Sequence, residues 1–320
     1  MSKIQWCDKT INPVIGCKKI SPACDNCYAI TMSRRLQSMK LRGYDGVVAK
    51  NKEEVMDWTG RLNFVPSELL KPKQWKKPKR IFLGSMTDIF HKDIEDQWLS
   101  EILNMIIDNP THVFMILTKR ADVMEKRMKE WYTSSKNKVI KNLWLGVTVE
   151  NQEQAISRVP YLLHTIASKR FVSVEPLLEE INLSMLITEN GGDRLRTVID
   201  PIITGTHTVW DGAKLIIETD FNKLDWVIVG GESGSKARPM DPNWVLSIKE
   251  KCEQGEVPFF FKQWGEYIDE SQITHKEQYK GNTFSFLTNG ALVLYRCGRK
   301  LAQDLINGKQ YHAFPKEKDL

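Results

Sequence analysis

Three cysteines near the amino terminus are the residues in this sequence best suited to chemistry. They share the spacing C-x6-C-x2-C and are Cys17, Cys24 and Cys27. A short apolar run, 11–15, precedes them, and a helical pattern opens at Tyr28, so the pattern predicts one strand-to-helix loop carrying all three thiols. Gly16 and Pro22 let the backbone of such a loop turn back on itself, which would allow three sulfurs to surround one metal centre.

Two metal centres are compatible with these thiols. Three thiolates without a fourth ligand nearby suit a [4Fe–4S] cluster with one open iron. Alternatively, Cys7 or a histidine such as His91 would complete a tetrahedral zinc site. A third reading is that the thiols only fill space, which is how we interpret the isolated Cys252 and Cys297.

Length and composition describe an ordinary globular protein. The chain has 320 residues, of which 41% are hydrophobic and 27% charged, with a net charge of +6. No stretch approaches 18 uninterrupted apolar residues, and the first residues, MSKIQWCDKT, lack the apolar core of a signal peptide. We therefore expect a cytoplasmic protein without a membrane partner, in which clustered thiols stay reduced and indicate a metal or redox site. The mild positive charge is compatible with a nucleic-acid partner.

Short apolar strands alternate with helical segments along most of the chain. We predict strands at 10–16, 80–85, 112–118, 142–148, 170–175, 225–230 and 257–262. We predict helices at 28–42, 98–107, 121–131 and 152–166. In the first helix, the candidate buried positions are Ile30, Leu36, Met39 and Leu41. Near-continuous apolar strands joined by single helices indicate a parallel sheet covered by helices, here an α/β fold of the partial TIM-like (β/α) barrel type.

Two parts of the chain depart from this alternation. Residues 183–224 contain Gly, Asn and Asp clusters around β-prone runs, which favours an insertion with a hairpin-like lid. The barrel would then occupy 1–265, and 266–320 would form a carboxyl-terminal extension packed on it. In that extension we predict a strand pair within 283–296 and a short helix at 300–307.

The run KPKQWKKPKR, residues 71–80, is the strongest basic patch of the sequence. It leads into the predicted strand 80–85, so in a parallel barrel it would lie at the amino ends of the strands, away from an active site. It is interpreted either as a solvated face, the more common role of a charge run, or as a nucleic-acid contact.

Polar residues follow almost every predicted strand, at the edge where parallel barrels carry their chemistry. They are Gly84–Asp88, Thr118–Arg120, Thr148–Asn151, Glu175–Pro176, Gly230–Gly234 and Lys262–Trp264. Asp88 could alternatively cap a helix, and Glu175 could only brace a loop. Two cations at a helix start, Lys119 and Arg120, indicate an anionic ligand, because they oppose the helix dipole. The Gly230–Gly231 pair would let a ligand approach the main chain closely.

These features together carry a resemblance to a known family. The cysteine triplet in the first loop of a partial α/β barrel resembles the radical S-adenosylmethionine superfamily, although that superfamily's usual spacing is C-x3-C-x2-C. Over nearly the whole chain, the ordered motifs resemble the three-Cys-motif phage protein family of phages and bacterial chromosomes. The motifs are INPVIGCKKISPACDNCYA, LGSMTDIF, LTKR, GVTVEN, SVEPLL, VGGESG, FFFKQWGE and GRKLAQDLINGKQYHAFP.

The superfamily resemblance implies roles for particular residues. The three clustered cysteines would hold three irons of a [4Fe–4S] cluster, whose fourth iron would chelate S-adenosylmethionine. Residues Gly84, Ser85, Met86 and Asp88 would occupy the place where the superfamily binds the methionine amino group. Thr148 and Glu150 would occupy the place of its ribose contacts. Electron transfer would then cleave the cofactor to give a radical that abstracts hydrogen from the substrate.

The substrate expected from these features is a nucleic acid or nucleotide, modified or repaired at a base. Cations that could face its phosphates are Lys18, Lys19, Lys119, Arg120, Lys236, Arg238 and Lys262. Candidates for catalytic groups are Glu175 and Glu232. A protein partner encoded nearby is a further possibility raised by the family resemblance. The alternative from another class is a non-catalytic, zinc-stabilised nucleic-acid-binding protein.

Overall fold

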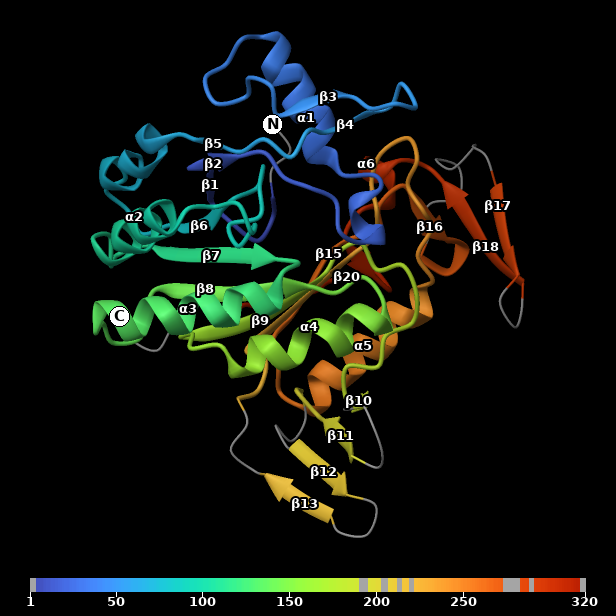
Figure 1. The fold of residues 1–320 in the computed structure, drawn as a ribbon. Helices are drawn as coiled ribbons and strands as arrows, with labels where there is room; N and C mark the ends of the chain where they lie inside the picture. Colours follow the sequence, from blue (N-terminus) through green and yellow to red (C-terminus); the bar gives the residue numbers. More distant parts are fainter. Residues whose placement is uncertain are drawn as a thin grey trace. The chain divides into compact units, whose positions relative to one another are not determined.

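The computed structural model describes residues 4–189, 195–202, 207–211, 215–218, 222–272, 283–287 and 291–316. These residues form two compact units. The first contains residues 4–147 and 165–170, and the second contains the described parts of 148–164 and 171–316. Figure 1 shows the elements in the order of the chain.

The main sheet is parallel and has the strand order β1-β6-β7-β8-β9-β14-β15. Its strands are β1 (Lys9–Ile11), β6 (Arg80–Leu83), β7 (Val113–Thr118), β8 (Leu143–Thr148), β9 (Lys169–Val174), β14 (Trp226–Gly230) and β15 (Phe259–Gln263). Among the described residues this is a mixed α/β fold with a seven-stranded parallel sheet, which is consistent with the predicted partial barrel.

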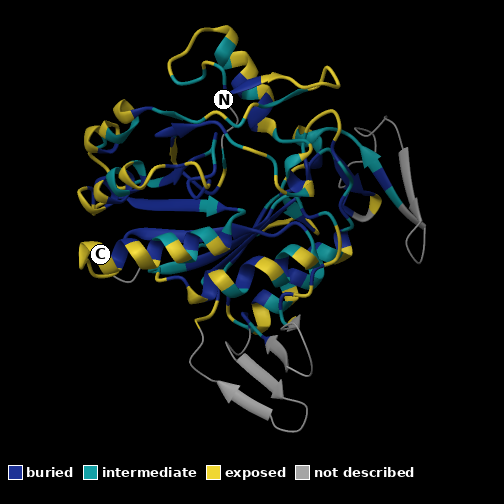
Figure 2. Ribbon diagram, viewed as in Figure 1, coloured by how far each residue is buried: buried dark blue, intermediate teal, exposed yellow. Residues whose placement is uncertain are grey.

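The described helices include the four predicted between strands of the main sheet, one further helix that was not predicted and a short helix near the carboxyl end. They are α1 (Tyr28–Ser38), α2 (Asp96–Ile107), α3 (Ala121–Ser135), α4 (Gln152–His164), α5 (Pro242–Gln254) and α6 (Arg299–Ala302). In α2 the buried residues include Leu99, Ile102, Leu103 and Ile106, the i, i+3, i+4, i+7 stripe of an amphipathic helix. Figure 2 shows this division, with buried strands and helices that are exposed along their outer sides.

The first unit adds a small lobe to its part of the sheet. Its strands form two antiparallel pairs, β2 (Val14–Ile15) with β5 (Asn63–Phe64) and β3 (Val48–Lys50) with β4 (Met56–Trp58). Short 3-10 turns follow at Pro66–Leu70 and Pro72–Gln74. The inner face of α1, with Ala29 and Ile30, packs in one apolar cluster with residues of this lobe.

The predicted strand 10–16 is wrong as a single element. It divides into β1, which pairs in parallel with β6, and β2, which pairs antiparallel with β5. Pro13 lies at the break; proline has no backbone N–H to donate, so it cannot continue a sheet ladder. The predicted buried positions Met39 and Leu41 are also wrong. Helix α1 ends at Ser38, and both side chains are exposed.

The second unit carries three further sheets. Residues of the predicted insertion form an antiparallel sheet of β10 (Leu186–Glu189), β11 (Leu195–Ile199), β12 (His207–Asp211) and β13 (Leu215–Glu218). A second antiparallel sheet contains β16 (Tyr267–Asp269), β17 (Thr283–Leu287) and β18 (Ala291–Arg296), and the third pairs β19 (Leu305–Ile306) with β20 (Lys309–Gln310).

The strand pair predicted within 283–296 is thus confirmed as β17 and β18. The helix predicted at 300–307 is only partly right, because α6 ends at Ala302 and β19 follows. No described helix has the length and apolar content needed to cross a membrane. The predicted division at residues 265 and 266 stays a prediction.

Candidate functional site

The three clustered cysteines lie in the loop between β2 and α1, as predicted. Cys17 follows β2 after Gly16, Cys24 ends the 3-10 turn Pro22–Cys24, and Cys27 precedes the first residue of α1. All three are partly buried and unbridged. The sulfur of Cys17 contacts the Lys18 carbonyl oxygen at 3.7 Å, and the sulfur of Cys24 lies 3.8 Å from Ser21 Oγ.

Burial keeps two of these thiols protonated. The pKa of Cys17 is raised to about 11, mainly by burial. The charge of Asp88 also raises this pKa, and the charge of Arg120 lowers it. Burial also raises the pKa of Cys27, against the lowering effect of Lys119. A thiol with a raised pKa is a poor nucleophile, because only the thiolate attacks. Cys17 and Cys27 therefore do not have the properties of nucleophilic cysteines.

The donor chemistry of the loop suits a thiolate-bound centre, but its described side chains do not form a closed ligand set. Among residues 4–316, within the described ranges, no group of three His, Cys, Asp or Glu side chains is placed to hold a metal ion. Neighbouring thiols nevertheless affect each other's ionisation. The charge of Cys27 raises the pKa of Cys17, and the charge of Cys24 raises the pKa of Cys27. To bind one centre, Cys17 and Cys24 would have to turn away from Lys18 O and Ser21 Oγ.

Asp88, predicted at the end of β6, is the centre of a hydrogen-bond network rather than a helix cap. Its Oδ1 accepts hydrogen bonds from Thr118 Oγ1 at 2.6 Å and from the Phe90 backbone N–H at 3.0 Å. Its Oδ2 accepts from the Lys119 backbone N–H at 3.1 Å and from Arg120 Nη1 at 2.8 Å. With four donors on a buried carboxylate, Asp88 is occupied by the protein itself.

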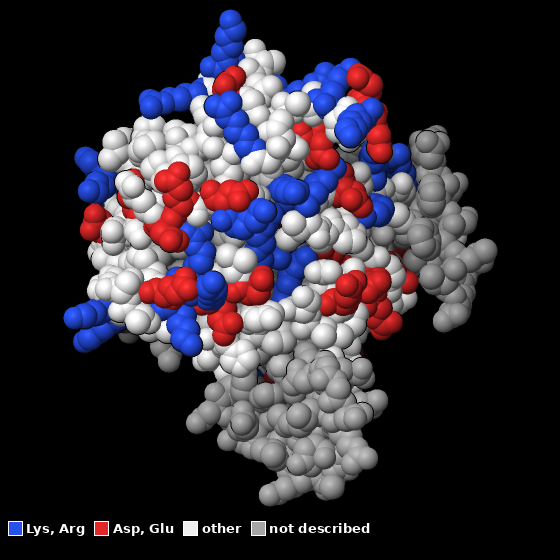
Figure 3. Space-filling view, in the orientation of Figure 1, with Lys and Arg blue, Asp and Glu red and all other residues white. Residues whose placement is uncertain are grey.

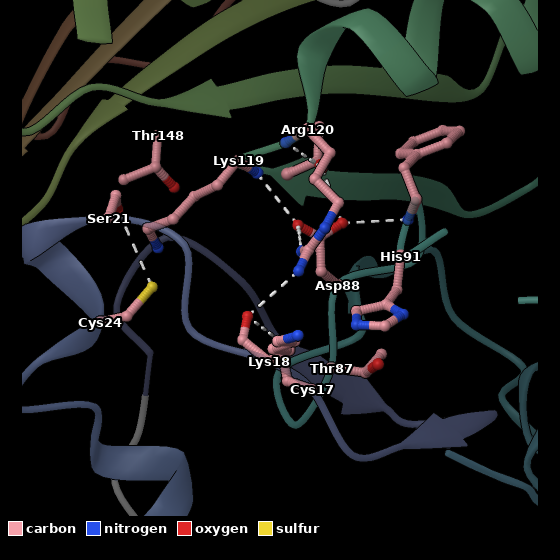
Figure 4. Close-up of polar contacts among 12 residues, drawn as sticks. Cys17, Lys18, Ser21, Cys24, Thr87, Asp88, His91, Lys119, Arg120 and Thr148 are labelled. Carbon is pink, nitrogen blue, oxygen red and sulfur yellow. Dashed lines mark hydrogen bonds and ion pairs between the residues drawn. The ribbon is translucent and has the colours of Figure 1, made fainter. Parts of the chain in front are cut away.

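Arg120 connects this network to the cysteine loop (Figure 4). While Nη1 pairs with Asp88, Nη2 donates to the Lys18 carbonyl oxygen at 3.1 Å. Its side chain is only 10% exposed. Arg120 was predicted to bind substrate. In the structure its side chain instead joins Asp88 to the cysteine loop from its position after β7.

Lys119 behaves differently from its neighbour. Its side chain extends from the end of β7 toward Ser21 and Cys24 (Figure 4), and its charge acts on Cys27. It has no ion-pair partner among the described residues. Of the two adjacent cations, Lys119 is the one whose charge remains available to an anion beside the thiols.

The loop Gly84–Asp88 is held against the cysteine loop by residues that sequence reasoning missed. Asn12 Oδ1 accepts hydrogen bonds from Ser85 Oγ at 3.1 Å and from the Met86 N–H at 3.0 Å. The Tyr28 hydroxyl donates to the Ser85 carbonyl oxygen at 2.9 Å. Gly84 has a positive φ of 84°, which glycine adopts without strain. The motif INPV contains Asn12, but nothing in its pattern shows that its side chain reaches a loop 73 residues away.

His91 is a buried polar group beside this network. Its ring is 1% exposed, and burial together with the nearby Arg120 lowers its pKa. Nδ1 accepts a hydrogen bond from the Asp93 N–H at 3.3 Å. Nε2 has no hydrogen-bond partner among the described residues. A neutral ring with Nδ1 as acceptor carries its proton on Nε2, so His91 holds an unused donor.

The predicted residues at the end of β8, Thr148 and Glu150, belong to the second unit, and Glu150 forms a buried ion pair. Glu150 is fully buried, and its Oε2 lies 2.8 Å from Arg158 Nη1 in α4. The same Nη1 donates to the Thr148 carbonyl oxygen at 2.7 Å. Thr148 and Glu150 thus fix the start of α4, and a fully buried carboxylate has no surface to offer a ribose in this conformation.

Glu175, a predicted catalytic candidate at the end of β9, is paired with a predicted substrate-binding residue. Its Oε1 lies 2.9 Å from Lys262 Nζ at the end of β15, and its Oε2 accepts from Ser173 Oγ at 3.0 Å. A Cβ on Gly230 would approach Glu175 Oε1 to 2.8 Å. Gly230 therefore makes room for this carboxylate.

Glu232, the other catalytic candidate, receives three hydrogen bonds from Arg238. The backbone N–H, Nε and Nη2 of Arg238 donate at 2.8, 2.9 and 2.7 Å. Lys236, on the same loop, is exposed. A Cβ on Gly231 would collide with the Trp264 carbonyl oxygen. The space at the two glycines, predicted for a ligand, is taken by the protein's own atoms.

Comparison with known proteins identifies one family. The family model described as "Protein of unknown function (DUF5131)" matches residues 1–315. No curated protein and no solved structure matches the chain. The family description carries no link to radical S-adenosylmethionine enzymes or to a three-Cys motif, so that part of the resemblance stays a prediction.

Proposed function

Because the chain belongs to the DUF5131 family, whose description names no activity, we propose a function from its own residues. We propose a radical S-adenosylmethionine-type enzyme, acting on a nucleic acid or nucleotide, with a [4Fe–4S] cluster on Cys17, Cys24 and Cys27. One observation carries the proposal. The thiols of Cys17, Cys24 and Cys27 lie in a single loop and are all partly buried, and beside them Lys119 has no ion-pair partner among the described residues.

When bound, such a cluster supplies electrons and one open iron position. The chain's own residues would hold the surroundings of that centre. Arg120 and Asp88 fix the ends of β6 and β7 against the loop, and Tyr28 ties α1 to Ser85. The ammonium group of Lys119 would complement an anion at the centre, such as the carboxylate of S-adenosylmethionine or a substrate phosphate.

The test begins with anaerobic purification and measurement of iron and sulfide. We expect about four of each per chain and a broad absorption near 400 nm, as is general for such clusters. Cys17→Ala, Cys24→Ala and Cys27→Ala should each lose iron, because each removes a ligand. Cys297→Ala is the matched control, since that thiol is also partly buried and should leave the iron content unchanged.

Reduction with dithionite in the presence of S-adenosylmethionine should then release 5′-deoxyadenosine. Full iron retention in Cys24→Ala would refute the cluster assignment. An iron-loaded protein that forms no 5′-deoxyadenosine would leave a structural cluster and refute the reaction class.

Zinc is the second candidate, and His91 is the observation that favours it. Its buried Nε2 has no described partner and could act as a nitrogen ligand in the neutral tautomer that carries its proton on Nδ1. Stoichiometric zinc without iron, lost in both Cys24→Ala and His91→Ala, would support a zinc-stabilised nucleic-acid-binding protein instead.

A further inference from the structure

The amino ends of the first unit's parallel strands form one edge of its sheet. The register pairs Lys9 with Ile81 and Arg80 with Val113, so the starts of β1, β6 and β7 lie side by side. Phe114 pairs with Leu143, which extends the same edge to the start of β8. Neighbouring strands are about 4.8 Å apart, so side chains that precede these strands share one narrow surface.

Lysines gather along this edge, and we refer to them as the basic edge. They are Lys9, Lys73, Lys76, Lys77, Lys79, Lys136, Lys138 and Lys141. Most are exposed, and none has an ion-pair partner among the described residues. Asp8, at the same edge, is already paired with Arg80 at 3.8 Å. Figure 3 shows one face of the molecule, on which Lys and Arg side chains are interspersed with Asp and Glu.

The run that carries four of these lysines is held in one conformation. Pro72 is buried, and its carbonyl oxygen lies 3.0 Å from His112 Nε2. The Trp75 backbone N–H donates to the same oxygen at 3.0 Å. The ring centroids of Trp75 and His112 lie 6.1 Å apart, and Lys9 Nζ lies 5.9 Å from the centroid of the Trp75 ring. A backbone fixed in this way loses little conformational freedom when the run binds a partner.

We propose that the basic edge binds the phosphate backbone of a nucleic acid, at a place separate from the cysteine loop. Unpaired lysines at fixed positions repel one another, and a row of phosphates would relieve that repulsion. Lysine suits this contact because its ammonium group is a compact charge that reads no sequence. The partly exposed ring of Trp75 offers a flat surface on which an unpaired base can stack. This binding requires neither the cluster nor the chemistry proposed above.

The experiment uses the full chain without added metal and a labelled 20-nucleotide DNA, single-stranded or duplex, followed by fluorescence anisotropy at 25–200 mM salt. The variant Lys76→Ala/Lys77→Ala/Lys141→Ala should weaken binding about tenfold and lower the salt slope by about 2 to 3. The control Lys52→Ala/Lys300→Ala/Lys309→Ala removes the same charge from exposed lysines elsewhere and should change the slope by less than about 0.5.

Three results would overturn the proposal. They are equal losses in the two triple variants, absence of binding at 25 mM salt, and tighter binding to phosphatidylglycerol vesicles than to DNA. The third result would assign the edge to an anionic membrane surface. Cys24→Ala should bind DNA like the unmodified chain, and the lysine variants should keep their iron. Failure of the basic edge is therefore distinguishable from failure of the cluster.

Discussion

The cysteine loop of the first unit and the strand ends of the second begin from the same sequence feature, polar residues directly after apolar strands. In the second unit each predicted carboxylate has its own cation. The pairs are Glu150 with Arg158, Glu175 with Lys262, and Glu232 with Arg238. In the first unit Asp88 is satisfied in this way, and Lys19 of the cysteine loop pairs with Asp57 at 3.3 Å, while the thiols and Lys119 have no ion-pair partner among the described residues.

Desolvation explains this difference. A buried carboxylate is costly unless a cation and hydrogen bonds compensate it, so its partner is part of the fold. A neutral thiol costs little to bury and needs no partner. The paired strand-end carboxylates therefore stabilise the fold, whereas the thiols, Lys119 and His91 Nε2 can still bind a ligand.

The largest effect should separate the two adjacent cations. Arg120→Ala leaves the buried Asp88 charge without its cation and should lower the free energy of unfolding by about 3 kcal/mol. Lys119→Ala breaks no described ion pair and should change it by less than about 0.5 kcal/mol. Urea unfolding followed by circular dichroism measures both. Equal effects would show that the two side chains do not have the different roles assigned to them.

The glycine pair of the second unit should respond next. Gly231→Ala places a methyl group against the Trp264 carbonyl oxygen and should cost about 1–3 kcal/mol of unfolding free energy. Gly230→Ala meets only the tip of Glu175, so its cost should fall in a Glu175→Ala background. The Gly231 cost should not fall there. Two glycines that tolerate alanine equally would leave the space open for a ligand after all.

The buried thiol of the second unit predicts a dependence on pH. Burial raises the pKa of Cys252 from 9.0 to about 12, so folding favours its neutral form. This contribution is complete below pH 9 and is lost as the pH rises from 9 through 12. Between pH 8 and pH 10 the unmodified chain should lose about 1 kcal/mol more unfolding free energy than Cys252→Ala. Parallel stability curves for the two proteins would contradict the assigned burial.

The smallest effect is expected at the Glu175–Lys262 pair. Both side chains keep some contact with solvent, 13% and 20% exposed, so their attraction is partly screened. Glu175→Gln and Lys262→Met should each cost about 1 kcal/mol or less in urea unfolding, and the double variant no more than either. If either substitution lowered the unfolding free energy as much as Arg120→Ala does, the Glu175–Lys262 pair would not be partly screened by solvent as inferred here.

Local sequence patterns predict most strands of the main sheet, four of its helices and the polar residues that follow the strands. The continuous apolar runs that became β6, β7 and β8 can hardly form anything except buried parallel strands, and the 3.6-residue stripe of α2 identifies its inner face. The dense cysteine spacing also located the strand-to-helix loop correctly, because a loop carrying three thiols stands out from its flanking patterns.

Which polar residues already have an ion-pair partner depends on the tertiary structure. Asp88 finds Arg120 32 residues away, and Glu175 finds Lys262 on a different strand. Such pairs depend on strand order and register, which local patterns do not encode. The same holds for Gly230 and Gly231. Their residue type predicts that other atoms approach the main chain closely, but not that these atoms belong to Glu175 and Trp264 of the protein itself. Residues predicted to act in catalysis or binding, such as Glu175 and Arg120, instead stabilise the fold, because each forms an ion pair with a residue far away in the sequence.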